Sequence, residues 1–147
     1  MDELIDMAIY KEVASEALYT AAQSQTTDPG AIALMKELAG EEQKHLVLLK
    51  TFKAAGTKRS HWHPEKVPAL KMSEYLTAAD TPGGAGIQDT LIFAMKREQE
   101  SMEFYSRMMS VMRSRPAKQL CQTLAREELK HRFRLEIIYD GMFYKED

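Results

Sequence analysis

Apolar and small side chains recur every three or four residues along four long stretches of the chain, with polar residues between them. This spacing is that of an amphipathic helix, whose apolar side chains line one face. It predicts helices over residues 2–24, 29–55, 87–112 and 116–140. The expected apolar face comprises Leu4, Ile5, Ala8, Ile9, Val13, Ala17 and Leu18 in the first helix, and Leu34, Leu38, Leu48 and Phe52 in the second. No segment alternates strictly in the manner of a strand, so the fold class is all-α.

The links between the predicted helices differ greatly in length. Residues 25–28 and 113–116 are short links, and short links join helices into antiparallel hairpins. The link over residues 57–86 is long; residues 71–79 within it have the pattern of a short helix, and His61-Trp62-His63 is expected to lie in a loop. We therefore predict one domain over residues 1–147, a four-helix bundle of two hairpins joined by a long crossover.

The two hairpins are copies of one unit, because the sequence matches itself at an offset of 86 residues. The 31 positions in 8–19 and 31–49 hold 13 identities, where about two are expected by chance at ordinary composition. The matched pairs are Ala8/Ala94, Glu12/Glu98, Ser15/Ser101, Tyr19/Tyr105, Ala31/Ala117, Leu34/Leu120, Leu38/Leu124, Ala39/Ala125, Glu41/Glu127, Glu42/Glu128, Lys44/Lys130, His45/His131 and Leu49/Leu135. A bundle built from these copies should have a pseudo-twofold axis.

Composition and charge narrow the classes of protein. The longest fully apolar runs have five residues, against the roughly 20 that a membrane helix needs, so no membrane span is expected. The acidic start of the chain does not resemble a secretory signal, which makes the cytoplasm the expected compartment. Cys121 is the only cysteine, which excludes an internal disulfide and an all-cysteine metal site. The net charge of −2 does not favour a nucleic-acid partner.

The repeated charged residues have the pattern of metal ligands. Glu42-x-x-His45 recurs as Glu128-x-x-His131, and residues three apart on a helix share a face, so each pair can bind one ion. Each copy also has a glutamate within the apolar face of its first helix, at Glu12 or Glu98. Buried acids are costly unless they are paired or bind metal. Four carboxylates and two imidazoles suit two ions such as iron or manganese, with zinc as a substitute, and buried ion pairs are the alternative.

These residues make the chain resemble the rubrerythrin branch of the ferritin-like superfamily over nearly its whole length, apart from the crossover and the tail. The resemblance implies a ferritin-like bundle that holds two iron ions per chain. It also implies the role of each ligand. Glu12 and Glu98 would be terminal ligands, Glu42 and Glu128 would bridge the two ions, and His45 and His131 would be terminal nitrogen ligands.

Tyr19 and Tyr105 follow the first-helix glutamates by seven residues, about 10.5 Å along the axis, so neither easily reaches the glutamate of its own helix. The resemblance implies that each hydroxyl hydrogen-bonds the glutamate of the other copy, Tyr19 to Glu98 and Tyr105 to Glu12, in support of the catalytic centre. The alternative is a core tyrosine whose hydroxyl bonds a backbone carbonyl.

Glu41 and Glu127 are candidates to hold the imidazole nitrogens that bind no metal, and a solvated helix face is the alternative for them. His61 and His63 are expected to be exposed to solvent, and the alternative is a second metal site.

The resemblance implies a di-iron oxidoreductase that reduces hydrogen peroxide or dioxygen and can also oxidise Fe²⁺. Paired CxxC motifs, which form the rubredoxin-like iron domain of full-length rubrerythrins, are missing from these 147 residues. The electrons would therefore come from a separate donor, such as a rubredoxin-like protein. Rubrerythrin relatives are typically dimers, so a homodimer is expected.

Two positions depart from related families. Ser101 stands where peroxidase-type rubrerythrins carry an extra glutamate, and Gln43 stands where bacterioferritin carries its haem methionine, so haem is not expected. The alternative functions are iron storage of the ferritin type, hydroxylation of an organic substrate at a di-iron centre, and a purely structural metal site.

Overall fold

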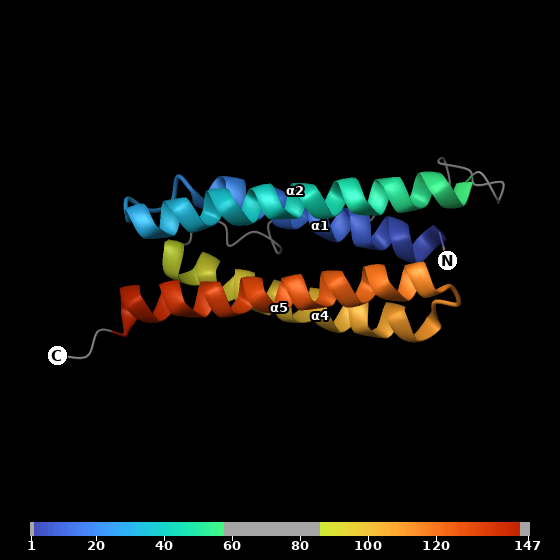
Figure 1. Cartoon of the computed structure of the whole chain (residues 1–147). Coiled ribbons are helices and arrows are strands. Elements are labelled where there is room, and N and C mark those ends of the chain that lie inside the picture. The colour runs from blue at the N-terminus through green and yellow to red at the C-terminus, as the bar shows by residue number, and fades with distance from the viewer. Residues whose placement is uncertain (1, 58–85, 145–147) are drawn as a thin grey trace.

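Four long helices make up the described part of the computed structural model, which covers residues 2–57 and 86–144. They are α1 (Asp2–Ala22), α2 (Pro29–Thr57), α4 (Ile87–Val111) and α5 (Arg115–Phe143). Figure 1 shows them as two antiparallel hairpins, α1 with α2 and α4 with α5, lying along each other. The all-α four-helix bundle predicted from the sequence is confirmed. The predicted short helix over 71–79 and the His61-Trp62-His63 segment lie outside the described residues.

Both hairpins turn into their second helix in the same way. The Asp28 carboxylate accepts a hydrogen bond of 2.8 Å from the backbone N–H of Ala31, which caps the start of α2. The Ser114 hydroxyl accepts one of 3.2 Å from the N–H of Ala117 and caps α5. Since Asp28 and Ser114 are 86 residues apart, the repeat extends to the chemistry of the turns.

Each helix packs against two others. α1 contacts α2 and α4, and α5 contacts α4 and α2. The apolar core consists of two clusters: one includes Ile5, Ala8, Leu49, Phe104, Tyr105, Met108 and Leu124, and the other includes Leu18, Tyr19, Leu34, Met35, Leu38, Leu91 and Leu135. Each cluster draws on all four helices. The polar residues predicted to bind metal fall between the two clusters along the sequence of every helix.

Several details of the prediction need correction. α1 ends at Ala22 and α4 at Val111, earlier than predicted, whereas α2 continues to Thr57 and α5 spans Arg115–Phe143. Two residues assigned to apolar faces are exposed, Ala17 and Leu48, and Leu48 is 46% exposed. Within the described ranges, no helix combines the length and the hydropathy needed to cross a membrane.

Candidate metal centre

The six residues with the pattern of metal ligands come together inside the bundle from all four helices. α1 and α4 supply one glutamate each, and α2 and α5 supply a glutamate and a histidine each. None of the six is more than 5% exposed, and they are Glu12, Glu42, His45, Glu98, Glu128 and His131. On each helix they continue the buried stripe of apolar residues, so the packing that forms the core also turns these groups inward.

The six side chains form two overlapping groups. One comprises Glu12, Glu42, His45 and Glu128, and the other comprises Glu42, Glu98, Glu128 and His131. Within each group, one donor atom per residue lies within 4.8 Å of all the others. Only Glu42 and Glu128 belong to both groups.

Both histidines turn Nδ1 toward the carboxylates. His45 Nδ1 lies 3.2 Å from Glu128 Oε1, 3.4 Å from Glu12 Oε2 and 3.6 Å from Glu42 Oε2. His131 Nδ1 lies 2.8 Å from Glu42 Oε1, 3.6 Å from Glu98 Oε2 and 3.7 Å from Glu128 Oε2. The two rings are stacked, with centroids 5.6 Å apart and planes inclined by 11°. The near-identical contacts express the pseudo-twofold symmetry in the side chains themselves.

The inner polar atoms of this cluster have no hydrogen-bond partner. These atoms lie close to one another, but no pair of them has the geometry of a hydrogen bond. The unpartnered atoms are both carboxylate oxygens of Glu42 and Glu128, Oε2 of Glu12 and Glu98, and Nδ1 of His45 and His131. Buried polar atoms without partners are rare and costly. Oxygen and imidazole donors aimed at one another in a shared space fit a pair of metal ions.

Without metal, the cluster shifts the pKa values of its own members. Burial lowers the pKa of His45, but the nearby Glu128 and Glu42 carboxylates outweigh burial and raise it to about 9. The same opposition, with Glu128, Glu42 and Glu98 as the carboxylates, raises the pKa of His131 to about 12. Burial, together with the charges of Glu98 and Glu42, raises the pKa of Glu128 well above its ordinary value. Protons therefore occupy the cluster at neutral pH, where metal ions would replace them.

A tyrosine from the opposite hairpin bonds each of the two glutamates on α1 and α4. The Tyr19 hydroxyl donates to Glu98 Oε1, and the Tyr105 hydroxyl donates to Glu12 Oε1 at 2.6 Å. These are the cross-hairpin bonds that the resemblance implies. In each glutamate one oxygen accepts from tyrosine and the other, Oε2, faces the cluster. The tyrosines thus fix the carboxylate orientation that leaves one oxygen for a metal ion.

Glu41 and Glu127 lie just outside the six. Glu41 Oε2 is 3.6 Å from His131 Nε2, and Glu127 forms a third group of possible donors with His45 and His131. The two carboxylates are 28% and 32% exposed, so they border the cluster and also reach solvent. Arg134, which the sequence analysis did not single out, donates to Glu41 Oε2 at 2.8 Å.

Comparison with known proteins agrees with this geometry. A family model described as Rubrerythrin matches residues 3–139. The chain belongs to the rubrerythrin family. Among solved structures it is similar to a hypothetical protein from Pyrococcus furiosus, with 23% identity and a TM-score of 0.75 over 95% of this chain and 87% of that one. That likeness supports the ferritin-like fold. No curated protein matches the chain.

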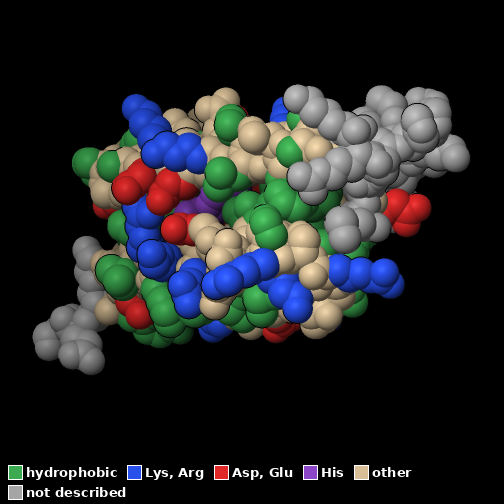
Figure 2. Space-filling view, turned by 45° about the vertical axis from the view of Figure 1, so that its right-hand side comes forward, with side chains coloured by type: hydrophobic (Ala, Val, Ile, Leu, Met, Phe, Trp, Pro, Cys, Tyr) green, Lys and Arg blue, Asp and Glu red, His purple; other side chains and the backbone are tan. Residues whose placement is uncertain are grey.

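Two further observations concern the surroundings of the cluster in this rubrerythrin-family chain. Ser101 is buried, and the neighbouring Glu100 is exposed and belongs to neither group of donors. Seen from outside, histidine reaches the surface in one hollow bordered by acidic, basic and hydrophobic side chains (Figure 2). Of the two histidines in the cluster, His45 is 5% exposed and His131 is fully buried.

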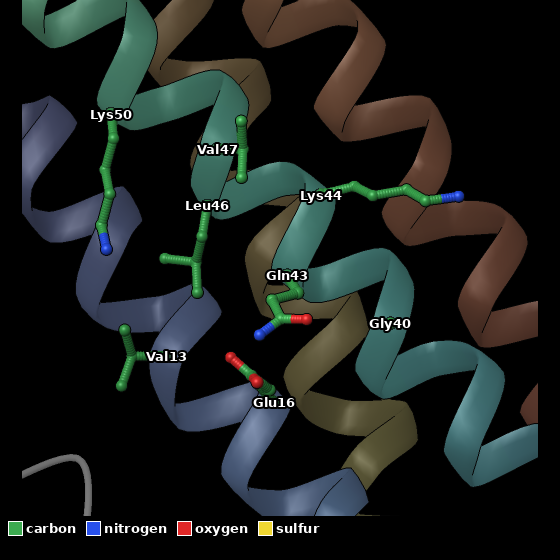
Figure 3. A pocket seen from close by; sticks show the side chains of 8 residues that line it. All are labelled: Val13, Glu16, Gly40, Gln43, Lys44, Leu46, Val47 and Lys50. Atoms are coloured by element: carbon green, nitrogen blue, oxygen red, sulfur yellow. The ribbon is translucent and has the colours of Figure 1, made fainter.

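A groove of about 670 Å³ on the α1–α2 hairpin is separate from the metal centre. Its lining residues are Val13, Glu16, Gly40, Gln43, Lys44, Leu46, Val47 and Lys50. Val13 and Leu46 point toward each other across it, and Lys44 points away (Figure 3). None of the six residues of the cluster lines this groove, so it belongs to the outer surface of the hairpin.

Proposed function

We propose that the chain is a di-iron oxidoreductase in which two iron ions bind to the six buried residues. One observation carries the proposal: two four-donor groups share Glu42 and Glu128 and no other residue. Glu12 and His45 would complete the binding of one ion, and Glu98 and His131 would complete the binding of the other. Membership of the rubrerythrin family supports this assignment. Carboxylate and imidazole donors suit iron, and manganese or zinc can take the same ligands.

The reaction we propose is the reduction of hydrogen peroxide to water, or of dioxygen, with electrons from a separate donor. Reduction of one peroxide molecule consumes two electrons and two protons and yields two water molecules. When bound, a pair of iron ions supplies the two electrons, one from each ion. A rubredoxin-like protein is a suitable donor, because the described residues hold no second iron-binding group with cysteine ligands. Oxidation of free Fe²⁺ is a second activity expected of the same centre.

Residues around the centre would orient the ligands of the ions and restrict the access of water. Tyr19 and Tyr105 fix the carboxylates of Glu98 and Glu12, so each terminal ligand is in place before metal binds. The two apolar clusters on either side restrict water, which strengthens the electrostatic interactions inside the cluster. Only a small oxidant suits a centre whose ligands are at most 5% exposed.

Anaerobic titration of the apoprotein with Fe²⁺, followed by stopped-flow mixing with peroxide or with dioxygen, tests the proposal. We expect two ions per chain, and near-ultraviolet ferric absorbance that forms on mixing with at least one of the two oxidants. The variants Glu42→Ala and Glu128→Ala remove the shared ligands and should abolish stable binding of the pair. Two-ion binding that survives both substitutions would falsify the assignment.

The same experiment separates oxidant reduction from iron storage. Uptake well beyond two ions per chain, together with a very large oligomer on size-exclusion chromatography, would indicate storage. A homodimer that binds two ions per chain and turns over peroxide with a reduced donor protein would support the oxidoreductase.

A further inference from the structure

The two halves of the metal centre differ in one contact, although the six ligands repeat closely. Arg134 on α5 donates from Nη1 to Glu41 Oε2 at 2.8 Å, and its Nη2 lies 2.5 Å from Glu37 Oε2. The position 86 residues earlier is Leu48, which has no charge and is 46% exposed. Arg134 therefore has an uncharged counterpart in the other hairpin, and the 86-residue repeat does not hold at this position.

Glu41 is the carboxylate nearest to Nε2 of His131, which has no hydrogen-bond partner. His131 turns Nδ1 to the cluster, so Nε2 must carry the proton when Nδ1 binds an ion. This nitrogen belongs to a fully buried side chain and has no hydrogen-bond partner, and Glu41 Oε2 lies 3.6 Å from it. A carboxylate that accepts the second imidazole proton fixes the ring and strengthens the ligand. Arg134 bonds this carboxylate through Nη1 while its Nη2 pairs with Glu37, and so holds Glu41 beside the ring.

Within residues 2–57 and 86–144, the other half of the centre has no equivalent arginine contact. Glu127 is the counterpart of Glu41, and its ion-pair partner is Lys130, at 3.9 Å. The Lys130 side chain is 68% exposed, so this pair is screened by water and orders Glu127 little. Glu127, which forms a group of possible donors with His45 and His131, is therefore less fixed than Glu41.

We infer that Arg134 is a positioning residue that makes the two ion positions unequal: the position served by Glu98 and His131 binds its ion more tightly and fills first. The inference rests on the proposed dinuclear centre and adds an order of loading to it. Loss of an outer partner of a ligating histidine typically lowers metal affinity by roughly 10–100-fold. We expect the lower end of that range here, because Arg134 acts through Glu41.

Anaerobic titration of the full-length apoprotein with Co²⁺, followed by visible absorption and calorimetry, tests the order. The wild type should bind two ions in steps separated by about tenfold or more in affinity. Arg134→Leu, which copies the residue of the other hairpin, should weaken the tighter step by about tenfold and leave the weaker step unchanged. Arg132→Leu is the matched control, since it removes the same charge from α5 but pairs with Glu136 and Gln99.

Two further variants assign the steps to the two positions. His131→Ala should remove the tight step, and His45→Ala should remove the weak one. Leu48→Arg places an arginine at the position equivalent to Arg134 and should tighten the weaker step. Apoprotein melting temperatures of Arg134→Leu and Arg132→Leu should agree within a few degrees, which separates positioning from general loss of structure.

The outcomes distinguish the inference from the proposed function. Equal affinities in the wild type that Arg134→Leu does not alter would overturn the order of loading, while two-ion binding still supports the centre. No Co²⁺ binding by the wild type would overturn both. A tight step that disappears in His45→Ala and persists in His131→Ala would also contradict the inference, because the order would be reversed.

Discussion

The Tyr105 hydroxyl on α4 donates a 2.6 Å hydrogen bond to Glu12 Oε1 on α1, across the interface between the two hairpins. Both groups are almost completely buried. Burial and the negative charge of Glu128 raise the pKa of Tyr105 well above its ordinary value, so the phenol keeps its proton and remains a donor. Helix packing and ligand orientation are therefore coupled through one side chain.

Replacing Tyr105 with phenylalanine should weaken both the fold and the metal centre. The change leaves Glu12 Oε1 buried without its donor, which should lower the free energy of unfolding of the apoprotein by about 1–3 kcal/mol. Metal affinity should fall by roughly tenfold or more, because the carboxylate loses its orientation. Denaturant unfolding and Co²⁺ titration measure the two effects.

Tyr139→Phe is the matched control, since its hydroxyl bonds Gln88 at an exposed position, 3.1 Å away. This variant should bind metal as the wild type does. Unaltered metal spectra and affinity in Tyr105→Phe and in Tyr19→Phe would contradict the supporting role of both tyrosines.

Glu128→Gln should stabilise the apoprotein while it abolishes the dinuclear centre. Burial and the charges of Glu98 and Glu42 raise the folded-state pKa of Glu128, so ionising it disfavours the folded state as pH rises above its ordinary value. The neutral amide removes that effect. At pH 7 we therefore expect the metal-free variant to melt at a higher temperature than the wild type.

Calorimetry gives the melting temperatures of Glu128→Gln and the wild type, each without metal and with Zn²⁺. Zn²⁺ should raise the melting temperature of the wild type strongly and that of the variant little. A metal-free variant that melts well below the wild type would show that the carboxylate stabilises the empty centre.

Much of the architecture could be predicted because the repeat and the helical period report packing directly. The error at Leu48 shows where this reasoning stops. Glu42 and His45 are part of the buried stripe of α2, and the stripe continues to Leu49. An interpretation that counts only apolar residues omits Glu42 and His45 and selects Leu48. Leu48 lies about 100° around the helix from the buried Leu49.

The contacts of Glu41 could not be predicted for a different reason. Whether its carboxylate faces an imidazole or solvent depends on how far α5 is rotated against α2, and no local pattern records that rotation. The mismatch of Leu48 with Arg134 in the repeat is visible in the sequence, but its meaning depends on Arg134 reaching Glu41 across the helix interface.

A buried ion pair in the first hairpin should contribute to stability without affecting the metal centre. Asp6 on α1 accepts a hydrogen bond from Lys53 on α2, and their side chains are 5% and 14% exposed. The equivalent residues of the second hairpin are Ile92 and Tyr139, so the fold does not require an ion pair here. Asp6→Ala should destabilise the domain by about 2–4 kcal/mol, because the lysine keeps its charge in a mostly buried position.

The double variant Asp6→Leu with Lys53→Met should recover most of that loss, since apolar residues of similar volume can replace a buried pair. Chemical denaturation measures all three proteins, and metal titration serves as the control. A double variant as unstable as Asp6→Ala would indicate that the pair is needed for packing, and altered metal affinity would show that the pair and the centre are coupled.

Metal binding and metal-free stability should respond to pH in opposite directions. In the apoprotein the pKa of His45 is raised from its ordinary value of 6.5 to about 9. A group whose pKa is raised on folding contributes stability that is fully present below the unfolded-state pKa and is lost as pH rises through the folded-state pKa. The melting temperature of the apoprotein should therefore fall between about pH 6.5 and 9.

Metal binding, by contrast, should tighten over the same range, because each ion must displace the proton from an imidazole Nδ1. The pKa values of about 9 for His45 and about 12 for His131 mean that both rings are protonated at pH 7. Calorimetric titration with Zn²⁺ in buffers of different ionisation enthalpy should therefore record at least about two protons released per chain at pH 7. His45→Ala should reduce that number by about one. Release of no protons, with an affinity that is constant from pH 6.5 to 9, would mean that the buried carboxylates do not hold the imidazoles in their charged form.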